Sequence, residues 1–244
     1  MKGVDILRIV LQPAFVLHHR PYRETSMLLD VFTQDYGRIG LVARGVRRSY
    51  SRLRHLLQPF FPLLISWQGK TELMTLQQVE PQNIPIYLRG ECLLSGFYLN
   101  ELLVRLLPKY DPHPQLYTIY QNTLLELKNA VLQQEYLRLF EKKLLDEIGY
   151  GLPLKQTMSD GQAFVADQVY RYYPEEGFAL CLPNENVPQE MLFSGKSLLA
   201  LASEQLTDAV SLHDAKRLMR MVLRALLGPQ VLHSRKLFRG VPIE

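Results

Sequence analysis

The residues of this chain best suited to chemistry are arginines that gather in one short stretch. Between residues 38 and 55 the sequence contains no acidic residue and six arginines: Arg38, Arg44, Arg47, Arg48, Arg52 and Arg54. A guanidinium is planar and can donate two hydrogen bonds to one phosphate in a fixed geometry, which an ammonium cannot. A loop that served solubility alone would normally mix charges of both signs. The stretch therefore predicts contact with phosphates, and the alternative is a solvated loop.

A second basic cluster falls on a helix that we expect over residues 211–227, with Ser211 as its N-cap and Gly228 at its end. Its spacing places the arginines on one face with His213, opposite an apolar stripe. The cluster comprises Lys216, Arg217, Arg220 and Arg224. We interpret these residues as a second functional basic surface, although a solvated helix face would show the same pattern.

The total charge says less than its distribution. The chain has 28 basic and 24 acidic residues, a net charge of +4 with a pI near 9.0. Residues 1–80 hold 11 basic and 6 acidic side chains, which gives +5, and residues 211–244 hold 7 and 2, which also gives +5. The weak excess is therefore two local clusters with a near-neutral middle.

Motifs for enzymatic catalysis are missing. Gly195-Lys196-Ser197 resembles the end of a phosphate loop, but the first glycine of that motif would be residue 190, which is Glu190. The sequence has no H-E-x-x-H, G-x-S-x-G or G-x-G-x-x-G motif. Two cysteines, Cys92 and Cys181, exclude a disulfide framework and a four-cysteine zinc site within this chain. We expect a non-enzymatic protein without cofactor or metal.

The elements that must hold the first arginine cluster read as strands. Turn residues separate five short runs rich in Val, Ile, Leu, Phe and Thr, at 14–18, 27–32, 38–44, 56–66 and 70–79. Five strands in about 70 residues with no helix between the early ones predict a small closed barrel, typically an OB-fold, whose face and loops bind oligonucleotides. An SH3-like barrel of the same length stays open as an alternative. Pro59 and Pro62 indicate that the fourth run is bent or at an edge.

The rest of the chain reads mainly as helices. We expect them at 90–107, 115–132, 133–148, 194–203 and 211–227, with one hairpin through 163–172 and 177–182. The fold class is therefore α+β, an N-terminal five-stranded OB-fold barrel followed by a mainly helical domain. We divide the chain into residues 1–82, a nucleic-acid-binding barrel, 83–155, a helical domain, and 156–244, an irregular segment with C-terminal helices. No membrane-spanning stretch is expected, and the predicted location is the cytoplasm.

A series of motifs in order and spacing resembles the RecO family of bacterial recombination mediator proteins. The motifs are AFVLHHRPYRETSMLLDVFTQDYGRIGLVARGVRR at 14–48, LQPFFPLL at 57–64, YLNELLVRLL at 98–107, LRLFEKKLLDEIGYG at 137–151, the Y-x-Y-x-x-E-x-G-F pattern at 170–178 and SRKLFR at 234–239. The resemblance covers nearly the whole length from about residue 13.

The resemblance implies a function. Such proteins bind single- and double-stranded DNA, anneal complementary strands and, with RecR, help RecA displace the single-strand-binding protein, whose acidic C-terminal tail they recognise. This implies DNA repair and recombination in association with the nucleoid. Some members hold zinc with four cysteines in the segment matching 152–182, where this chain has only Cys181. We therefore expect a degenerate zinc-finger region without zinc.

The resemblance also implies a site for the partner's tail. A basic residue on the helix matching 137–148 contributes to it in the family, which makes Arg138 the first candidate and Lys142, one turn away, the second. An ordinary exposed helix residue is the alternative for Arg138. For base stacking we single out Tyr36 and Tyr50, which lie in polar turns near the arginines, and place Trp67 in the core.

Two other functions stay open on the residues alone. An OB-fold RNA-binding factor of translation or RNA processing would need the same phosphate contacts. A metal-independent hydrolase is the other, because catalytic carboxylates alone make a weak sequence motif.

Overall fold

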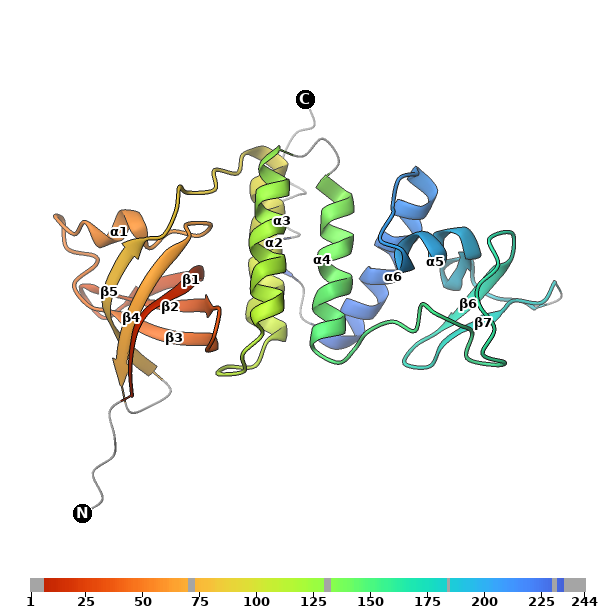
Figure 1. Cartoon of the computed structure of the whole chain (residues 1–244), viewed down its shortest axis with the longest axis horizontal. Coiled ribbons are helices and arrows are strands. Elements are labelled where there is room, and N and C mark those ends of the chain that lie inside the picture. The colour runs from red at the N-terminus through yellow and green to blue at the C-terminus, as the bar shows by residue number, and fades with distance from the viewer. Residues whose placement is uncertain (1–6, 70–72, 130–132, 184, 230–231, 235–244) are drawn as a thin grey trace, which may run out of the picture. The chain divides into compact units, whose positions relative to one another are not determined.

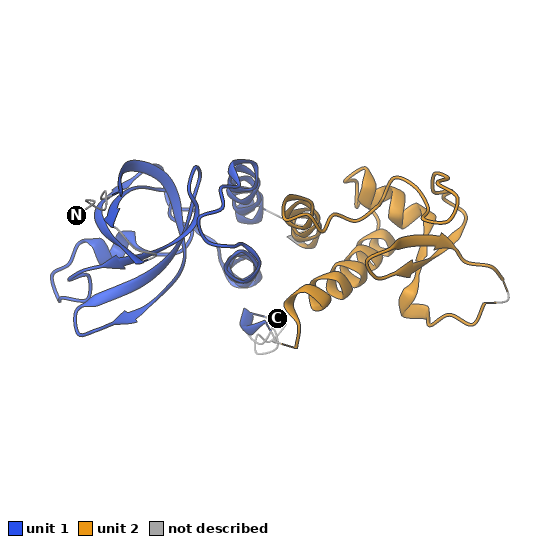
Figure 2. Ribbon diagram, turned by 90° about the horizontal axis from the view of Figure 1, so that it is seen from below, with its two compact units in different colours: residues 1–131, 231–244 blue, residues 132–230 orange. Residues whose placement is uncertain are grey.

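The computed structural model describes residues 7–69, 73–129, 133–183, 185–229 and 232–234. The chain forms two compact units, one of residues 1–131 and 231–244 and one of residues 132–230 (Figure 2). The predicted boundary at residue 82 thus lies inside the first unit, which holds the barrel together with two helices. The division into three domains stays a prediction.

The first unit begins with a closed barrel of five strands in the order β1-β2-β3-β5-β4 (Figure 1). The strands are β1 (Leu7–Tyr22), β2 (Ser26–Thr33), β3 (Gly37–Ala43), β4 (Leu63–Gly69) and β5 (Leu73–Pro81). The long β1 pairs antiparallel with both β2 and β4, and β3 closes the barrel by running parallel to β5. The predicted five-stranded barrel is confirmed.

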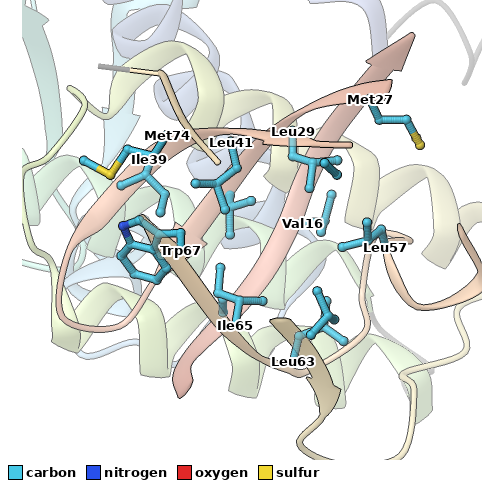
Figure 3. Packing of buried hydrophobic residues seen from close by; sticks show 14 of the residues in the cluster. Val16, Met27, Leu29, Ile39, Leu41, Leu57, Leu63, Ile65, Trp67 and Met74 are labelled. Atoms are coloured by element: carbon cyan, nitrogen blue, oxygen red, sulfur yellow. The ribbon is translucent and has the colours of Figure 1, made fainter. Parts of the chain in front are cut away.

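The barrel interior is filled by one apolar cluster (Figure 3). Alternate residues of each strand point inward, as the period of two requires. Trp67 is almost fully buried there, which confirms its predicted place in the core. Leu57 and Val46 enter the same cluster from the segment between β3 and β4. These two side chains fasten the arginine-rich loop to the barrel core.

The fourth predicted strand, residues 56–66, is wrong in its first half. A short helix, α1 (Leu53–Leu56), precedes a turn, and β4 begins only at Leu63. Pro59 and Pro62 have no N–H to give to a strand ladder, which favours the turn over an early strand.

Two helices, α2 (Gly90–Leu106) and α3 (Pro114–Asn129), pack on the barrel within the same unit. Asn100 of α2 donates from Nδ2 to the carbonyl of Leu17 at 2.9 Å, and the hydroxyl of Tyr120 donates to Asn100 Oδ1 at 2.6 Å. The ring of Phe15 meets that of Tyr120 edge to face. The buried amide of Asn100 is thus paired where strand and helices meet, as a buried amide requires.

Residues near the chain end complete this first unit. Glu101 of α2 accepts hydrogen bonds from the backbone N–H groups of His233 and Ser234, at 2.8 Å each, and from the Ser234 hydroxyl at 2.7 Å. Arg105 pairs with the same carboxylate at 2.7 Å, and Leu232 is buried. We call this contact between Glu101 and residues 232–234 the C-terminal clasp.

The second unit combines helices with a small sheet. Its elements are α4 (Gln133–Glu147), β6 (Val169–Tyr173), β7 (Gly177–Leu180), the 3-10 turn η1 (Gln189–Met191), β8 (Leu192–Ser194), α5 (Gly195–Ala202) and α6 (Ala209–Leu227). The sheet has the order β7-β6-β8, so the predicted hairpin is confirmed with shorter strands. Its core is aromatic, made of Phe164, Tyr170, Tyr172, Phe178 and Phe193 in edge-to-face and tilted contacts.

The start of α6 differs from the prediction. The helix begins at Ala209 and its N-cap is Asp208, whose carboxylate accepts from the N–H groups of Val210 and Ser211. Ser211 instead lies in the first turn and donates its hydroxyl to Asp208. Asp caps as well as Ser does, so the sequence offered two caps three residues apart. The end at Gly228, with φ of 65°, is confirmed.

Candidate nucleic-acid interface

The loop between β3 and α1 carries the first arginine cluster and is held firmly to the barrel. Gly45 has φ of +69°, and the buried Val46 follows it into the core. Arg47 donates its backbone N–H to Thr25 at 2.9 Å and its Nη1 to the carbonyl of Arg23 at 3.0 Å. The loop is therefore joined to the turn between β1 and β2.

Five of the six predicted arginines are exposed on this loop and on α1. They are Arg44, Arg47, Arg48, Arg52 and Arg54. Tyr50 at the tip is 98% exposed, so its whole ring is open to a ligand. In the part of the chain that the structure describes, none of these arginines pairs with a carboxylate. An unneutralised, exposed row of guanidinium groups is what phosphate binding needs.

Arg38 stands apart from this cluster. Its Nη1 pairs with Asp30 at 3.0 Å, and its Nε donates to the carbonyl of Leu107 at the end of α2 at 3.0 Å. The backbone nearby is close as well, since Tyr110 donates its N–H to the carbonyl of Arg38. Arg38 joins barrel and helix within the first unit, and this geometry does not support its predicted contact with DNA.

Two further basic residues, which were not predicted, lie beside the loop between β3 and α1. Arg20 and Arg23 are exposed at the end of β1 and in its turn, and the Arg23 carbonyl binds Arg47. His19 lies close to Arg54: burial lowers the pKa of His19, and the charges of His18 and Arg54 add to this effect. The two arginines of the sequence R-P-Y-R at 20–23 could have marked this turn as basic. Only the fold shows that the turn lies beside the loop between β3 and α1.

Tyr36 is a weaker stacking candidate than Tyr50. It is half-buried, and its ring meets Trp67 edge to face at 5.4 Å between centroids. Because this contact anchors Tyr36 on the core, its geometry does not support the predicted stacking role.

The second basic cluster is used largely within its own unit. Arg217 pairs with Asp214 at 2.8 Å, donates to the carbonyls of Gln189 and Leu192, and lies 4.4 Å over the ring of Phe193. Its predicted place on the solvated face is therefore wrong. Arg220 and Arg224 are exposed as predicted.

Lys216, also in that cluster, lies between α6 and α4. It donates to Gln134 Oε1 at 3.1 Å. Burial lowers the pKa of Lys216, repulsion from Arg138 and Arg220 lowers it further, and Glu141 opposes them.

The two residues predicted to bind a partner's tail are both paired on α4. Arg138 is only 8% exposed, and its Nη2 lies 2.9 Å from Oε1 of the fully buried Glu141. Lys142 lies 2.8 Å from Glu204, which also accepts from Lys143. That α4 carries this site stays a prediction. The alternative for Arg138, an ordinary exposed helix residue, is excluded because Arg138 is buried.

Among the described residues, no three His, Cys, Asp or Glu side chains are grouped as a metal site. Within the same ranges, no helix has both the length and the apolar character that crossing a membrane requires.

Comparison with known proteins decides the family. Residues 7–85 match the family model described as "Recombination protein O N terminal", and residues 89–236 match "Recombination protein O C terminal". The chain belongs to the RecO family.

Relatives named DNA repair protein RecO extend this match over the chain. The protein of Coxiella burnetii (strain RSA 331 / Henzerling II) is 49% identical over 230 residues, which are 94% of this chain and 98% of that protein. That of Nitrosococcus oceani is 49% identical over 232 residues, 95% and 93%. That of Nitrosospira multiformis is 44% identical over 237 residues, 97% and 98%. Membership in the RecO family supports a role in DNA repair and recombination over one in translation or RNA processing.

Proposed function

We propose that this RecO family member is a non-enzymatic mediator that binds single- and double-stranded DNA through the loop between β3 and α1. The observation that carries the proposal is the row of exposed arginines on a loop fastened to the barrel core, none of which forms an ion pair within the described residues. Such contacts neutralise phosphates and leave base edges free. They therefore give salt-dependent affinity without sequence preference.

The test is a triple substitution, Arg44→Ala, Arg47→Ala and Arg48→Ala, measured by fluorescence anisotropy at several salt concentrations. Three lost phosphate contacts should lower the slope of log K against log salt by about 2 on single strands and about 3 on duplex. The matched control is Arg38→Ala, which removes an arginine that is already paired with Asp30. Its affinity is corrected for the fraction of unfolded protein. An unchanged slope in the triple variant would reject the loop.

Strand annealing follows from the same chemistry. Two complementary strands repel each other, and a protein that neutralises both while leaving bases open lowers that barrier. We infer that the wild type speeds annealing of complementary oligonucleotides and that the triple variant does so less. Equal annealing rates for the two would contradict this step. Oligonucleotides left intact after long incubation with magnesium would exclude a hydrolase.

We further infer that RecR and the single-strand-binding protein are partners and that together they load RecA onto coated DNA. Two cations, Arg138 and Arg220, and one acid, Glu141, act on the charge of Lys216, so positive charge is in excess among these four side chains. This excess of positive charge favours an acidic tail. The tail would have to compete with the carboxylates that now pair with Arg138 and Lys142.

A titration with a peptide ending in that acidic tail tests the site. Arg138→Glu should abolish binding, but it also leaves Glu141 buried beside a second acid and can unfold the unit. The exposed Arg220→Glu keeps the fold and should weaken the peptide's affinity several-fold. Full affinity in Arg220→Glu, together with full affinity in Arg138→Glu variants shown to be folded, would overturn the assignment. Association with the nucleoid in the cytoplasm stays a prediction that microscopy of a fluorescent fusion would test.

A further inference from the structure

The segment that leads from β5 to α2, residues 82–89, alternates between buried and exposed side chains over its last four residues. Ile84 is 74% exposed and Tyr87 62% exposed, whereas Ile86 and Leu88 on either side of Tyr87 are buried. An extended chain sends neighbouring side chains to opposite sides. The burial of Ile86 and Leu88 therefore fixes Tyr87 outward.

Backbone and side-chain contacts hold the segment against the barrel. Gln82 donates its N–H to the carbonyl of Pro62 at 2.9 Å, and Ile86 donates to that of Phe60 at 3.1 Å. Leu88 and Phe60 also fill the space above Gly96 of α2, where a Cβ would lie only 2.6 Å and 2.8 Å from their side-chain atoms. The backbone on both sides of Tyr87 is thus fixed.

The ring of Tyr87 is itself supported from one side. It meets the ring of Phe61 at 6.3 Å between centroids and 79° between planes, and Phe61 packs on the barrel core. An edge-to-face contact of this kind orients a ring while most of its surface stays open. A ring that is already oriented loses little conformational entropy when a flat ligand stacks on it.

Positive charge accompanies this ring. Arg89 is exposed two residues further on, and its backbone is still extended, with φ of −134° and ψ of 156°, so it points to the same side as Tyr87. Within the described ranges Arg89 makes no ion pair. Aromatic ring and cation thus leave the segment on the same side, one suited to a base and the other to a phosphate.

The segment also lies within reach of the arginine loop. Phe61 follows Arg54 by seven positions, which limits the distance between their Cα atoms to about 25 Å even in a fully extended chain. Helix α1 contacts β5, at whose end the segment begins, and Figure 1 shows both at the same end of the barrel. A binding site of about 4–16 nucleotides per OB-fold can cover both.

We propose that Tyr87 is a stacking platform for an unpaired nucleobase and that Arg89 binds the adjoining phosphate of the same single strand. The proposal rests on the DNA binding proposed above and adds a preference to it. In a duplex the bases are stacked on one another and cannot reach Tyr87, so only single strands gain from this contact. The arginine loop serves both forms of DNA, and the 82–89 segment favours the single strand.

The test compares Tyr87→Ala with Tyr87→Phe, which keeps the ring, and with Tyr150→Ala, which removes a tyrosine of similar exposure, 57%, from the other unit. Anisotropy with an oligo-dT and with a duplex of equal length gives the affinities. Tyr87→Ala should weaken oligo-dT binding about fivefold to 150-fold and leave duplex binding unchanged. Tyr87→Phe and Tyr150→Ala should bind both like the wild type.

A photocrosslink locates the contact independently. Oligo-dT with one 5-iododeoxyuridine should crosslink, under long-wavelength ultraviolet light, to the peptide that contains Tyr87, and Tyr87→Ala should lose this product. Unchanged oligo-dT affinity in Tyr87→Ala, or an equal loss on duplex, would overturn the platform while the arginine triple variant still tests DNA binding. If neither the triple variant nor Tyr87→Ala affects binding, the proposed function fails as well.

Discussion

Two regions of this molecule carry the same kind of charge and use it differently. The loop between β3 and α1 and the helix α6 are both rich in arginine, and in the sequence each belongs to a segment of net charge +5. In the structure the loop exposes Arg44, Arg47, Arg48, Arg52 and Arg54. On α6, by contrast, Arg217 is bound by a carboxylate, two carbonyls and an aromatic ring.

The difference comes from the neighbours that each element has. The loop between β3 and α1 touches the barrel through backbone contacts, its buried Val46 and the bond from Arg47 to the carbonyl of Arg23, and its arginines stay exposed. A helix packs on other elements, and the five donors of an arginine can satisfy carbonyls that would otherwise be left without partners. Equal charge in sequence therefore corresponds to exposed charge on the loop and, at Arg217, to internal contacts on α6, where Arg220 and Arg224 stay exposed.

Reversing charge should separate the regions most strongly. We expect Arg47→Glu, Arg48→Glu and Arg52→Glu together to weaken DNA binding about a thousandfold, because three attractions become repulsions. Arg220→Glu with Arg224→Glu should weaken it far less. Anisotropy at fixed salt measures both. Equal losses would show that α6 binds DNA as strongly as the loop and would remove the contrast.

For the free energy of unfolding we expect the opposite order, with a larger loss from α6 than from the loop. Arg217→Ala removes an ion pair, two bonds to carbonyls and a cation–π contact from a half-buried site, so we expect a loss of about 2–4 kcal/mol in the free energy of unfolding. Arg48→Ala on the loop should change it by less than about 0.5 kcal/mol. Urea unfolding of the two variants gives the values. A stable Arg217→Ala protein would mean that its contacts contribute little.

Acid should act on the first unit through Glu101. Burial alone would raise the pKa of Glu101, but hydrogen bonds from Ser234 and His233 and the charge of Arg105 outweigh it and lower that pKa below the ordinary 4.5. The carboxylate thus stabilises the fold fully above pH 4.5, and this contribution is lost as the pH falls through the lower folded-state value. Glu101→Gln should cost about 1–2 kcal/mol at neutral pH and flatten the acid limb of stability. An acid limb identical to the wild type's would contradict the role of this residue.

The smallest effect concerns the turn between β1 and β2. Arg20→Ala should weaken DNA binding about two- to fivefold and lower the salt slope by about 1, since one phosphate contact is lost. Arg8→Ala, on the far part of β1, is the control. If both variants bind like the wild type, the interface ends at the loop.

Much of the fold could be predicted from the sequence because strands and turn residues alternate clearly. Five strands and their closure into a barrel follow from short apolar runs and Gly-rich turns. The helix α1 could not be predicted, since four residues give no periodic signal. The parallel pairing of β3 with β5 could not be predicted either. The cap of α6 was misplaced because Asp208 and Ser211 both suit it.

The position of the candidate site along the sequence could be predicted, but the spatial neighbours of its residues could not. The absence of acids from residues 38–55 identified the loop, and five of the six arginines in that stretch are exposed. Arg38 was misassigned because nothing in its flanking sequence shows that Asp30 and the carbonyl of Leu107 lie beside it. Arg23 was missed for the same reason, because its nearness to Arg47 is a product of strand pairing. Tertiary neighbours decide whether a cation is free.

The C-terminal clasp sets an order of events during synthesis of the chain. Glu101 is made early, but the N–H groups that bind it belong to His233 and Ser234, within a dozen residues of the end of the 244-residue sequence. The ribosome delivers the chain from the N-terminus at about 5–20 residues per second. All residues of the second unit are therefore made before the first unit receives its last partners. The barrel-bearing unit begins first and is completed last.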